Sequence, residues 1–227
     1  MKAGATLIFD LDGTLVDTAP DLLASLNVVL TRIGHREVVP AELRHLVGHG
    51  VRKLFERAFT GTGADVPDAT LNAYCDEFLV HYRANIARFS RPFAGVTETL
   101  TALKRDAYAL GVCTNKPQDL SELLLAELDL TRYFGGVLGA GKARFTKPDP
   151  RHILDLIETL GGDPARSVMI GDSPPDVAAA RAANIPVIVL TYGYTPVPAA
   201  ELGADAITDD FTQIPALVAR LLTGNEV

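Results

Sequence analysis

A chain of 227 residues, of which 48% are hydrophobic, is long enough to bury a full core, so a disordered protein is excluded. The formal net charge of -7 argues against a general binder of nucleic acid or of acidic membranes, because both partners require a basic surface. A small anionic substrate remains compatible with this charge.

The N-terminus, the hydropathy and the cysteines together predict a cytoplasmic protein. Only a few apolar residues precede Asp10, so the basic start and long apolar centre of a signal peptide are missing. The most continuous apolar run, residues 185–190, has the length of a strand of about six residues and not of a membrane span. Cys75 and Cys113 each lie in an apolar run, which is typical of small buried side chains in a reducing compartment.

The first predicted element is a strand over residues 6–9, which runs directly into Asp10-Leu11-Asp12-Gly13-Thr14-Leu15. Because side chains alternate along a strand, Asp10 and Asp12 can point the same way where the strand ends, and Gly13 can turn the chain. In such a pair one carboxylate can attack phosphorus while the other handles the leaving-group proton, with a divalent cation to neutralise the crowded charge. An EF-hand calcium loop needs its glycine at the sixth position, whereas this glycine is the fourth residue. A plain turn leaves the second apolar run, Leu15-Val16, unexplained.

From about residue 18 to residue 91 only helical periodicity is present, which predicts a helical domain inserted into the rest of the fold. Two stripes of residues at helical spacing are interpreted as faces that pack in a core. They comprise Leu22, Leu23, Leu26, Val29, Leu30 and Ile33, and then Leu71, Tyr74, Cys75, Phe78, Leu79, Tyr82, Ile86 and Phe89. The predicted domains are a core of residues 1–17 and 92–227 and a helical cap of residues 18–91.

After residue 91 short β-rich runs alternate with helical patterns. Strands are predicted over residues 108–113, 137–138, 168–170 and 187–190, and helices over residues 96–104, 120–128 and 153–160. This alternation predicts an α/β fold with a doubly wound parallel sheet. Ligands bind such sheets outside the carboxyl ends of the strands, so Asp10, Thr114 and Asp172 are expected to meet although they are far apart in the sequence.

Four segments resemble, in order and spacing, the four motifs of the haloacid dehalogenase-like superfamily. They are Asp10-Leu11-Asp12-Gly13-Thr14-Leu15, Thr114-Asn115-Lys116-Pro117, Lys147-Pro148 and Gly171-Asp172-Ser173-Pro174-Pro175-Asp176. Within the superfamily the chain is most similar to the bacterial phosphoglycolate phosphatases, on the weaker signals of residues 16–22, 47–50 and 191–194. The resemblance implies a Rossmann-like core with an inserted helical cap.

The resemblance also implies a role for each site residue. Asp10 is expected to be the nucleophile that forms an aspartyl-phosphate, and Asp12 to be first the general acid and then the general base. Magnesium would take oxygen ligands from the Asp10 side chain, the Asp12 backbone carbonyl and Asp172. The Thr114 hydroxyl and the backbone N–H of Asn115 are expected to donate to the phosphate. Lys147 would lie against the phosphate and Asp10.

Two of these residues have alternative interpretations. Thr114 suits a helix cap as well as a phosphate site. Asp176 falls in the first turn of a helix predicted to start near Pro174-Pro175, where it either orients the metal ligands from behind or only complements the helix dipole. The two prolines before Asp176 are unusual for the superfamily and bring the hydrogen bonds of this loop into question.

The expected function is the Mg²⁺-dependent hydrolysis of a small phosphorylated metabolite, for which the resemblance implies 2-phosphoglycolate, by a monomer or homodimer that binds neither nucleic acid nor membrane. A phosphosugar mutase would share all four motifs and remains an alternative, as does a phosphatase for another small metabolite. A dehalogenase would not need Asp12. A phospho-receiver module, from a different class of protein, would not need a large helical insert.

Two sequences that resemble other nucleotide or ester sites are set aside. Residues 136–143 nearly match a phosphate-binding P-loop, but Ala143 lacks the hydroxyl that would hold magnesium. Gly171-Asp172-Ser173 resembles the start of some serine esterases, but the base of such an enzyme would be a later histidine, and none follows His152.

Three further patterns, in loops and in the insert, are interpreted without a catalytic or metal-binding role. His45 and His49 have the spacing of helical metal ligands, but a zinc-protease glutamate and an evident third ligand are missing. Gly48 and Gly50 either let the backbone approach a small substrate or end a helix. Residues 192–194 are interpreted as a loop with packed aromatic side chains.

Overall fold

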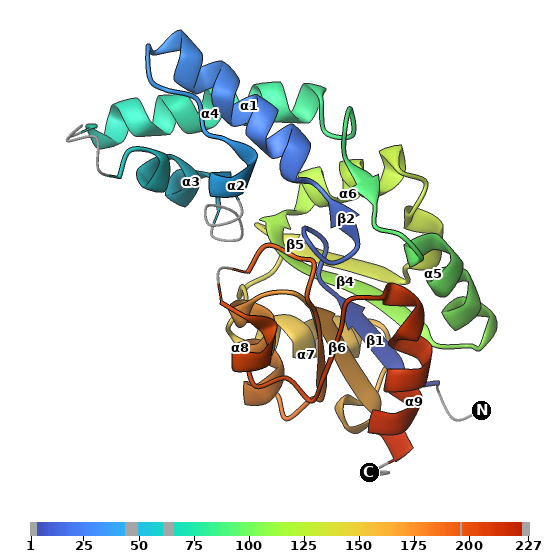
Figure 1. The fold of residues 1–227 in the computed structure, drawn as a ribbon. Helices are drawn as coiled ribbons and strands as arrows, with labels where there is room; N and C mark the ends of the chain where they lie inside the picture. The colour runs from blue at the N-terminus through green and yellow to red at the C-terminus, as the bar shows by residue number, and fades with distance from the viewer. Residues whose placement is uncertain (1–3, 44–49, 61–65, 196, 224–227) are drawn as a thin grey trace.

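The computed structural model describes residues 4–43, 50–60, 66–195 and 197–223. At its centre lies a six-stranded parallel sheet with the strand order β5-β4-β1-β6-β7-β8 (Figure 1). The strands are β1 (Thr6–Phe9), β4 (Ala109–Pro117), β5 (Gly136–Ala140), β6 (Ser167–Gly171), β7 (Val187–Leu190) and β8 (Ala206–Thr208). The predicted α/β fold with a doubly wound parallel sheet is confirmed.

Helices cover both faces of the sheet, because the side chains of its buried strands alternate between two cores. Leu7 and Phe9 of β1 pack in the core under α5, α6 and α9, and Ile8 between them packs in the core under α7 and α8. These helices are α5 (Val96–Arg105), α6 (Gln118–Glu127), α7 (Pro150–Thr159), α8 (Pro174–Ala182) and α9 (Ile214–Thr223). Short 3-10 helices span Thr131–Tyr133, Pro164–Arg166, Ala199–Glu201 and Phe211–Gln213.

The predicted boundaries need three corrections. Strand β4 continues to Pro117, beyond the predicted end at residue 113, because pairing with β5 shifts register after Cys113 and resumes at Pro117. Strand β8 was not anticipated, since only three residues of it pair. The second stripe of the insert does not belong to one helix: its helix ends at Ala84, and Phe89 is 52% exposed although Ile86 is buried.

The four helices described between β1 and α5 form a separate body beyond the carboxyl ends of the sheet strands (Figure 1). They are α1 (Ala19–Arg32), α2 (Pro40–Leu43), α3 (Val51–Ala58) and α4 (Asp68–Ala84), and α4 packs on both α1 and α3. The chain enters and leaves this body through two short strands that pair antiparallel, β2 (Val16–Asp17) and β3 (Arg91–Pro92). This arrangement is consistent with a cap of residues 18–91, and the division into domains stays a prediction.

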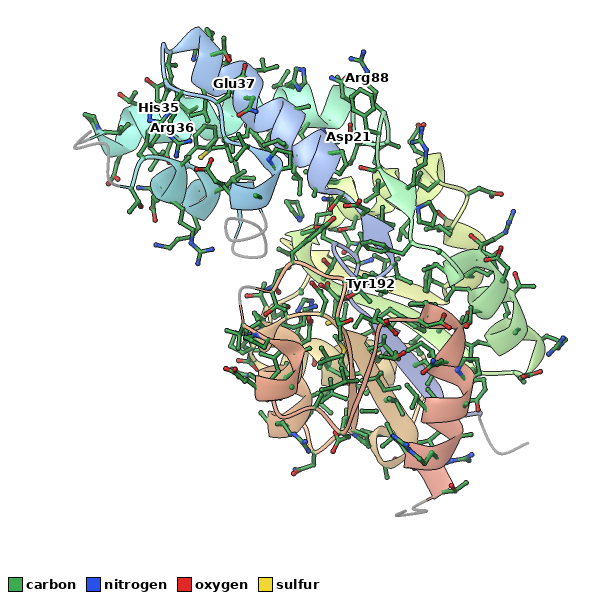
Figure 2. The ribbon with its side chains drawn as sticks, in the orientation of Figure 1. Asp21, His35, Arg36, Glu37, Arg88 and Tyr192 are labelled. Carbon is green, nitrogen blue, oxygen red and sulfur yellow. The ribbon has the colours of Figure 1, made fainter. Side chains whose placement is uncertain are left out.

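A buried carboxylate joins the first and last segments of this helical body. Asp21 lies in the first turn of α1, with its side chain directed at the segment that returns to β3 (Figure 2). Its Oδ2 accepts hydrogen bonds of 2.7 Å from both the backbone N–H and the hydroxyl of Ser90, and the backbone N–H of Phe89 donates to both of its oxygens. Charged acceptors make stronger hydrogen bonds than neutral ones, so this clip fixes the two segments against each other.

Among the described residues, no helix combines the length and the hydropathy that a membrane crossing requires. Cys75 and Cys113 are free thiols, which agrees with the interpretation that they form no disulfide. Cys113 is buried in the sheet as predicted, whereas Cys75 is only half-buried on α4.

Candidate active site

The strand order creates a natural ligand site beside β1. Chain connections leave β1 toward β4 on one side and later return to β6 on its other side, so the carboxyl ends of these three strands surround a crevice. Asp10 follows β1, Thr114 lies in β4 and Asp172 follows β6, and all three border one cavity of about 440 Å³. The expected meeting of these distant residues therefore occurs. The opposite wall belongs to the helical body and includes Leu54 and Phe78.

A buried lysine connects two carboxylates at the base of this cavity. The Nζ atom of Lys147 lies 2.8 Å from Asp10 Oδ1 and 2.6 Å from Asp176 Oδ1, and it donates to the carbonyl of Cys113 at 2.7 Å. The Lys147 side chain is 2% exposed, so this ammonium is held by protein groups and not by water. Asp176, the residue with two interpretations, is fully buried against Lys147, which rejects the surface helix-dipole role for it.

The electrostatics of the cluster follow from burial of several like charges. Burial raises the pKa of Asp10 to about 6, because the nearby charges of Asp176 and Asp12 reinforce desolvation and Lys147 offsets them only in part. Burial and the charges of Asp176 and Asp10 raise the pKa of Asp172 well above its ordinary value. Burial alone would lower the pKa of Lys147, but the two carboxylates it contacts outweigh that effect and raise it. The lysine stays cationic.

Asp172 is held in one orientation by residues from two loops. Its Oδ1 accepts a 3.0 Å hydrogen bond from the Thr14 hydroxyl, and its Oδ2 accepts a 2.7 Å bond from the backbone N–H of Tyr194. Two glycines make room for it: a Cβ atom on Gly13, which has φ +84, would lie 2.5 Å from Asp172 Oδ2, and one on Gly193 would lie 2.2 Å from Asp172 Cβ. A residue larger than glycine at position 13 or 193 would therefore displace the Asp172 carboxylate.

The double proline before Asp176 does not disrupt its loop. Asp176 Oδ2 accepts from the backbone N–H of Asp172 at 3.2 Å, and from the backbone N–H and hydroxyl of Ser173 at 3.1 and 2.6 Å. The prolines occupy the first positions of α8, where a helix has no internal use for the missing N–H groups. The question that the sequence raised about these hydrogen bonds is thus answered by ordinary helix-start geometry.

The acidic cluster fits a divalent cation. Asp10, Asp172 and Asp176 each offer an oxygen, and these atoms lie within 4.8 Å of one another. Lys147 supplies one positive charge against the three carboxylates, and Asp10 Oδ1 receives no correctly directed hydrogen bond from the described residues. Hard cations such as Mg²⁺ prefer carboxylate oxygens and water. Asp10 and Asp172 border the cavity whereas Asp176 is fully buried, so Asp10 and Asp172 are the side chains that a cation in the cavity can reach.

Thr114 and Asn115 lie where an anion would meet Asp10. The Thr114 hydroxyl accepts from the backbone N–H of Lys116 at 3.2 Å, which leaves its own hydrogen for another acceptor. Residue Pro117, and not Thr114, precedes α6, so Thr114 is not the cap of that helix. The Asn115 side chain exchanges two 2.9 Å hydrogen bonds with the backbone of Lys147, which ties the second motif to the third.

A buried histidine supports the same lysine from behind. The Nδ1 atom of His152 accepts from the Lys147 backbone N–H at 3.2 Å, and Nε2 faces the carbonyl of Leu138 at 3.0 Å. Burial and the charge of Lys147 lower the pKa of His152 to about 4. The ring is therefore neutral at ordinary pH, which suits one acceptor and one donor nitrogen.

Several site residues were missed from the sequence. Thr14 and Lys116 belong to recognised motifs but were given no role, and Tyr194 was interpreted only as a packed aromatic. Lys116 Nζ lies 3.1 Å from Asp12 Oδ1 and 2.7 Å from the Tyr82 hydroxyl, so it links the expected acid to the helical body. Lys116 could have been identified from the sequence, because it is a charged residue inside the second motif.

The patterns set aside in the sequence have different outcomes. The loop of residues 192–194 supplies the Tyr194 backbone N–H that donates to Asp172. No helix follows residues 136–143 directly, because β5 leads into a turn and α7 begins only at Pro150. Gly50 precedes α3 with φ 85 and borders the cavity, so it stands at the start of a described helix, and the approach of its backbone to a substrate stays a prediction. His45, His49 and Gly48 lie outside the described residues.

Comparison with known proteins agrees with this geometry. The profile of the haloacid dehalogenase-like hydrolases matches residues 7–190. A phosphoglycolate phosphatase of Agrobacterium fabrum is 47% identical over 95% of this chain and 93% of that protein, and one of Caulobacter vibrioides is 43% identical over 97% and 93%. The crystal structure of a predicted phosphoglycolate phosphatase from Haemophilus somnus is 32% identical, with a TM-score of 0.89 over 96% of this chain and 99% of the other. The chain belongs to the haloacid dehalogenase-like hydrolase family.

Proposed function

We propose that this protein hydrolyses 2-phosphoglycolate to glycolate and phosphate. That it is a phosphoric monoester hydrolase follows from its family and from relatives named phosphoglycolate phosphatase at up to 47% identity over most of the chain. The observation that carries the proposal is the buried contact of Asp10 with Lys147, beside Thr114 and Asp172, on one wall of a closed-in cavity. A carboxylate nucleophile, an ammonium and a hydroxyl on one wall suit a phosphoryl group.

In the first step, a carboxylate oxygen of Asp10 attacks phosphorus and the bond from phosphorus to the glycolate oxygen breaks. Asp12 gives its proton to that departing oxygen. Thr114, the backbone N–H of Asn115 and Lys147 bind the other phosphoryl oxygens and stabilise the charge that develops on them. The step leaves an aspartyl-phosphate at Asp10 and releases glycolate.

In the second step, Asp12 removes a proton from a water molecule, and the resulting oxygen attacks phosphorus. The bond between phosphorus and Asp10 breaks, so phosphate leaves and the carboxylate of Asp10 is restored. Asp12 ends the cycle protonated, as it began. Lys147 stays bound to Asp10 and Asp176 throughout and keeps the nucleophile in place.

The Asp10 and Asp172 side chains and the Asp12 backbone carbonyl would hold a Mg²⁺ ion. The ion would supply positive charge that neutralises the phosphate and the carboxylates around it. Thr14 and Tyr194 hold Asp172 in the orientation that such binding requires.

The helical body completes the site from the opposite side. Leu54 and Phe78 line the wall that faces the sheet residues, so approach of this body to the core excludes bulk water from the reacting groups. A phospho-receiver module would need no such wall. We retain the sequence-based predictions of a cytoplasmic location and of a monomer or homodimer.

The test is a panel of phosphate esters assayed for phosphate release with Mg²⁺ and with EDTA. We expect 2-phosphoglycolate to have the highest kcat/KM and EDTA to abolish turnover. Activity confined to other esters would reject the substrate, and isomer formation without phosphate release would identify a phosphosugar mutase. A stable aspartyl-phosphate without turnover would identify a receiver module.

A further inference from the structure

Lys116 is a buried cation that the proposed reaction steps do not use. Its side chain is 4% exposed, and its Nζ atom lies 3.1 and 3.3 Å from the two oxygens of Asp12. The same atom donates to the Tyr82 hydroxyl at 2.7 Å and lies 4.6 Å from the centre of the Tyr82 ring. An ammonium has three N–H donors. The two Asp12 oxygens and the Tyr82 hydroxyl occupy these three donors, and the longest of the bonds, at 3.3 Å to Asp12, is the one that an incoming acceptor can replace.

Tyr82 offers a second donor at the same place. Its hydroxyl oxygen accepts from Lys116, and no acceptor for its own hydrogen is found in the part of the chain that the structure describes. Burial raises the pKa of Tyr82 to about 12, so the hydroxyl keeps this hydrogen at neutral pH. Lys116 and Tyr82 both border the cavity, one from the sheet and the other from α4.

The rest of the lining on this side of Asp12 is mostly apolar. Leu22, Leu54, Phe78 and Leu120 border the cavity there, on α1, α3, α4 and α6. An anion placed against such a wall is costly unless it is paired. A small number of placed polar groups in an apolar pocket is the usual source of substrate orientation and specificity.

We propose that Lys116, together with the Tyr82 hydroxyl, binds the carboxylate of the substrate. This inference rests on the proposed function, in which Asp12 protonates the ester oxygen of 2-phosphoglycolate. The carboxylate of that substrate is one methylene away from the ester oxygen. A carboxylate in that position lies close to the group that contacts Asp12 on the side of the helical body. That group is Lys116, and Tyr82 contacts Lys116 in turn.

Two other cations border the cavity among its described residues. Lys147 contacts Asp10, Asp176 and the Cys113 carbonyl, so its charge is placed at the phosphate end. Arg57 borders the cavity from α3 and is the rival for the carboxylate. The experiment therefore compares Lys116 with Arg57.

The test measures kcat/KM for 2-phosphoglycolate and for 2-hydroxyethyl phosphate, in which a neutral hydroxymethyl group replaces the carboxylate. Because Lys116 also contacts Asp12, Lys116→Met is expected to lower kcat on both esters. The ratio of the two kcat/KM values cancels that common loss. We expect the parent to prefer 2-phosphoglycolate, and Lys116→Met to reduce this preference by about 10- to 100-fold, mainly through a higher KM for 2-phosphoglycolate.

Two further variants keep the inference falsifiable if Lys116→Met does not fold. Lys116→Arg keeps the charge and should retain part of the preference, and Tyr82→Phe keeps the ring and should reduce the preference less than loss of the ammonium does. Arg57→Met should leave the ratio of the two esters close to that of the parent. An unchanged ratio in both Lys116→Met and Tyr82→Phe, or loss of the preference in Arg57→Met alone, would overturn the inference.

Failure of the inference and failure of the proposed function give different results. A parent that hydrolyses both esters with equal kcat/KM is a phosphatase that does not bind the carboxylate, which overturns the inference alone. A parent that releases no phosphate from 2-phosphoglycolate while hydrolysing other esters overturns the proposed substrate, and the inference with it.

Discussion

Replacing the nucleophile should abolish catalysis and at the same time stabilise the metal-free fold. Asp10→Asn keeps the size of the side chain and removes its negative charge, so it imitates a permanently protonated Asp10. Without metal, the charged form of Asp10 is unfavourable, because burial raises its pKa from 3.8 to about 6. The variant does not have this unfavourable charge.

The size of the effect follows from the pKa difference between the folded and unfolded states. A carboxyl group whose folded pKa is raised contributes stability that is fully present below the unfolded pKa and is lost as pH rises through the folded pKa. A rise of about 2 pKa units corresponds to about 3 kcal/mol at pH 7.5, and to about half of that at pH 5, where Asp10 is mostly protonated in the folded state. Metal-free Asp10→Asn should therefore be more stable than the parent by these amounts.

The assay is urea unfolding of the parent and of Asp10→Asn in EDTA at pH 7.5 and pH 5, with phosphate release measured on the same preparations. Asp209→Asn is the matched control, because it removes the same charge from an exposed position. We expect the control to stay within about 0.5 kcal/mol of the parent at both pH values.

Two results would refute this reasoning. A metal-free Asp10→Asn protein that is no more stable than the parent at pH 7.5 would mean that the charge of Asp10 is well compensated without metal. A stability gain that does not shrink between pH 7.5 and pH 5 would have a cause other than the ionisation of Asp10. Turnover close to that of the parent would remove Asp10 from the role of nucleophile.

Three further predictions concern the metal, the phosphate site and the clip at Asp21. In thermal-shift measurements, Mg²⁺ should raise the melting temperature of the metal-free protein more at pH 7.5 than at pH 5. The reason is that at pH 5 the ion must displace the proton of Asp10. An equal rise at both pH values would contradict this prediction. Thr114→Val should lower kcat/KM by about 100-fold, with a smaller loss of stability because the Lys116 backbone N–H loses its acceptor, and full activity would show that the hydroxyl does not bind the transition state. Asp21→Ala should lower the free energy of unfolding by about 2 to 4 kcal/mol, because the buried N–H and hydroxyl of Ser90 and the part-buried N–H of Phe89 lose their acceptor. A loss below about 0.5 kcal/mol would rule out a structural role.

The sheet and its active edge were predictable because they depend on local signals. Short apolar runs such as residues 6–9 and 168–170 each end at a polar residue, and parallel strands place such ends at one edge of a sheet. Likewise, α8 begins at Pro174, where Pro174-Pro175 predicted its start, and Asp176 lies in its first turn. These inferences need only strand alternation and helix capping.

The contacts between distant side chains were not predictable in the same way. The choice between a surface role and a buried role for Asp176 depends on Lys147, which reaches it from another loop. The bond from Tyr194 to Asp172 and the pairing of Lys116 with Tyr82 need the loop after β7 and the helical body to be in place. Strand β8 pairs through only three residues, which is too short for a periodic signal.

The clip made by Asp21 has a consequence for how this architecture can change over evolutionary time. Asp21 and its partners at Phe89 and Ser90 all lie inside the inserted segment, near its two ends. The two ends of the predicted cap are therefore held together by contacts within the cap itself. The core needs only one insertion point for it, between Asp17 and Arg91. A module closed in this way can be exchanged as a block, so new substrate preferences can arise by swapping it without redesign of the phosphate chemistry below.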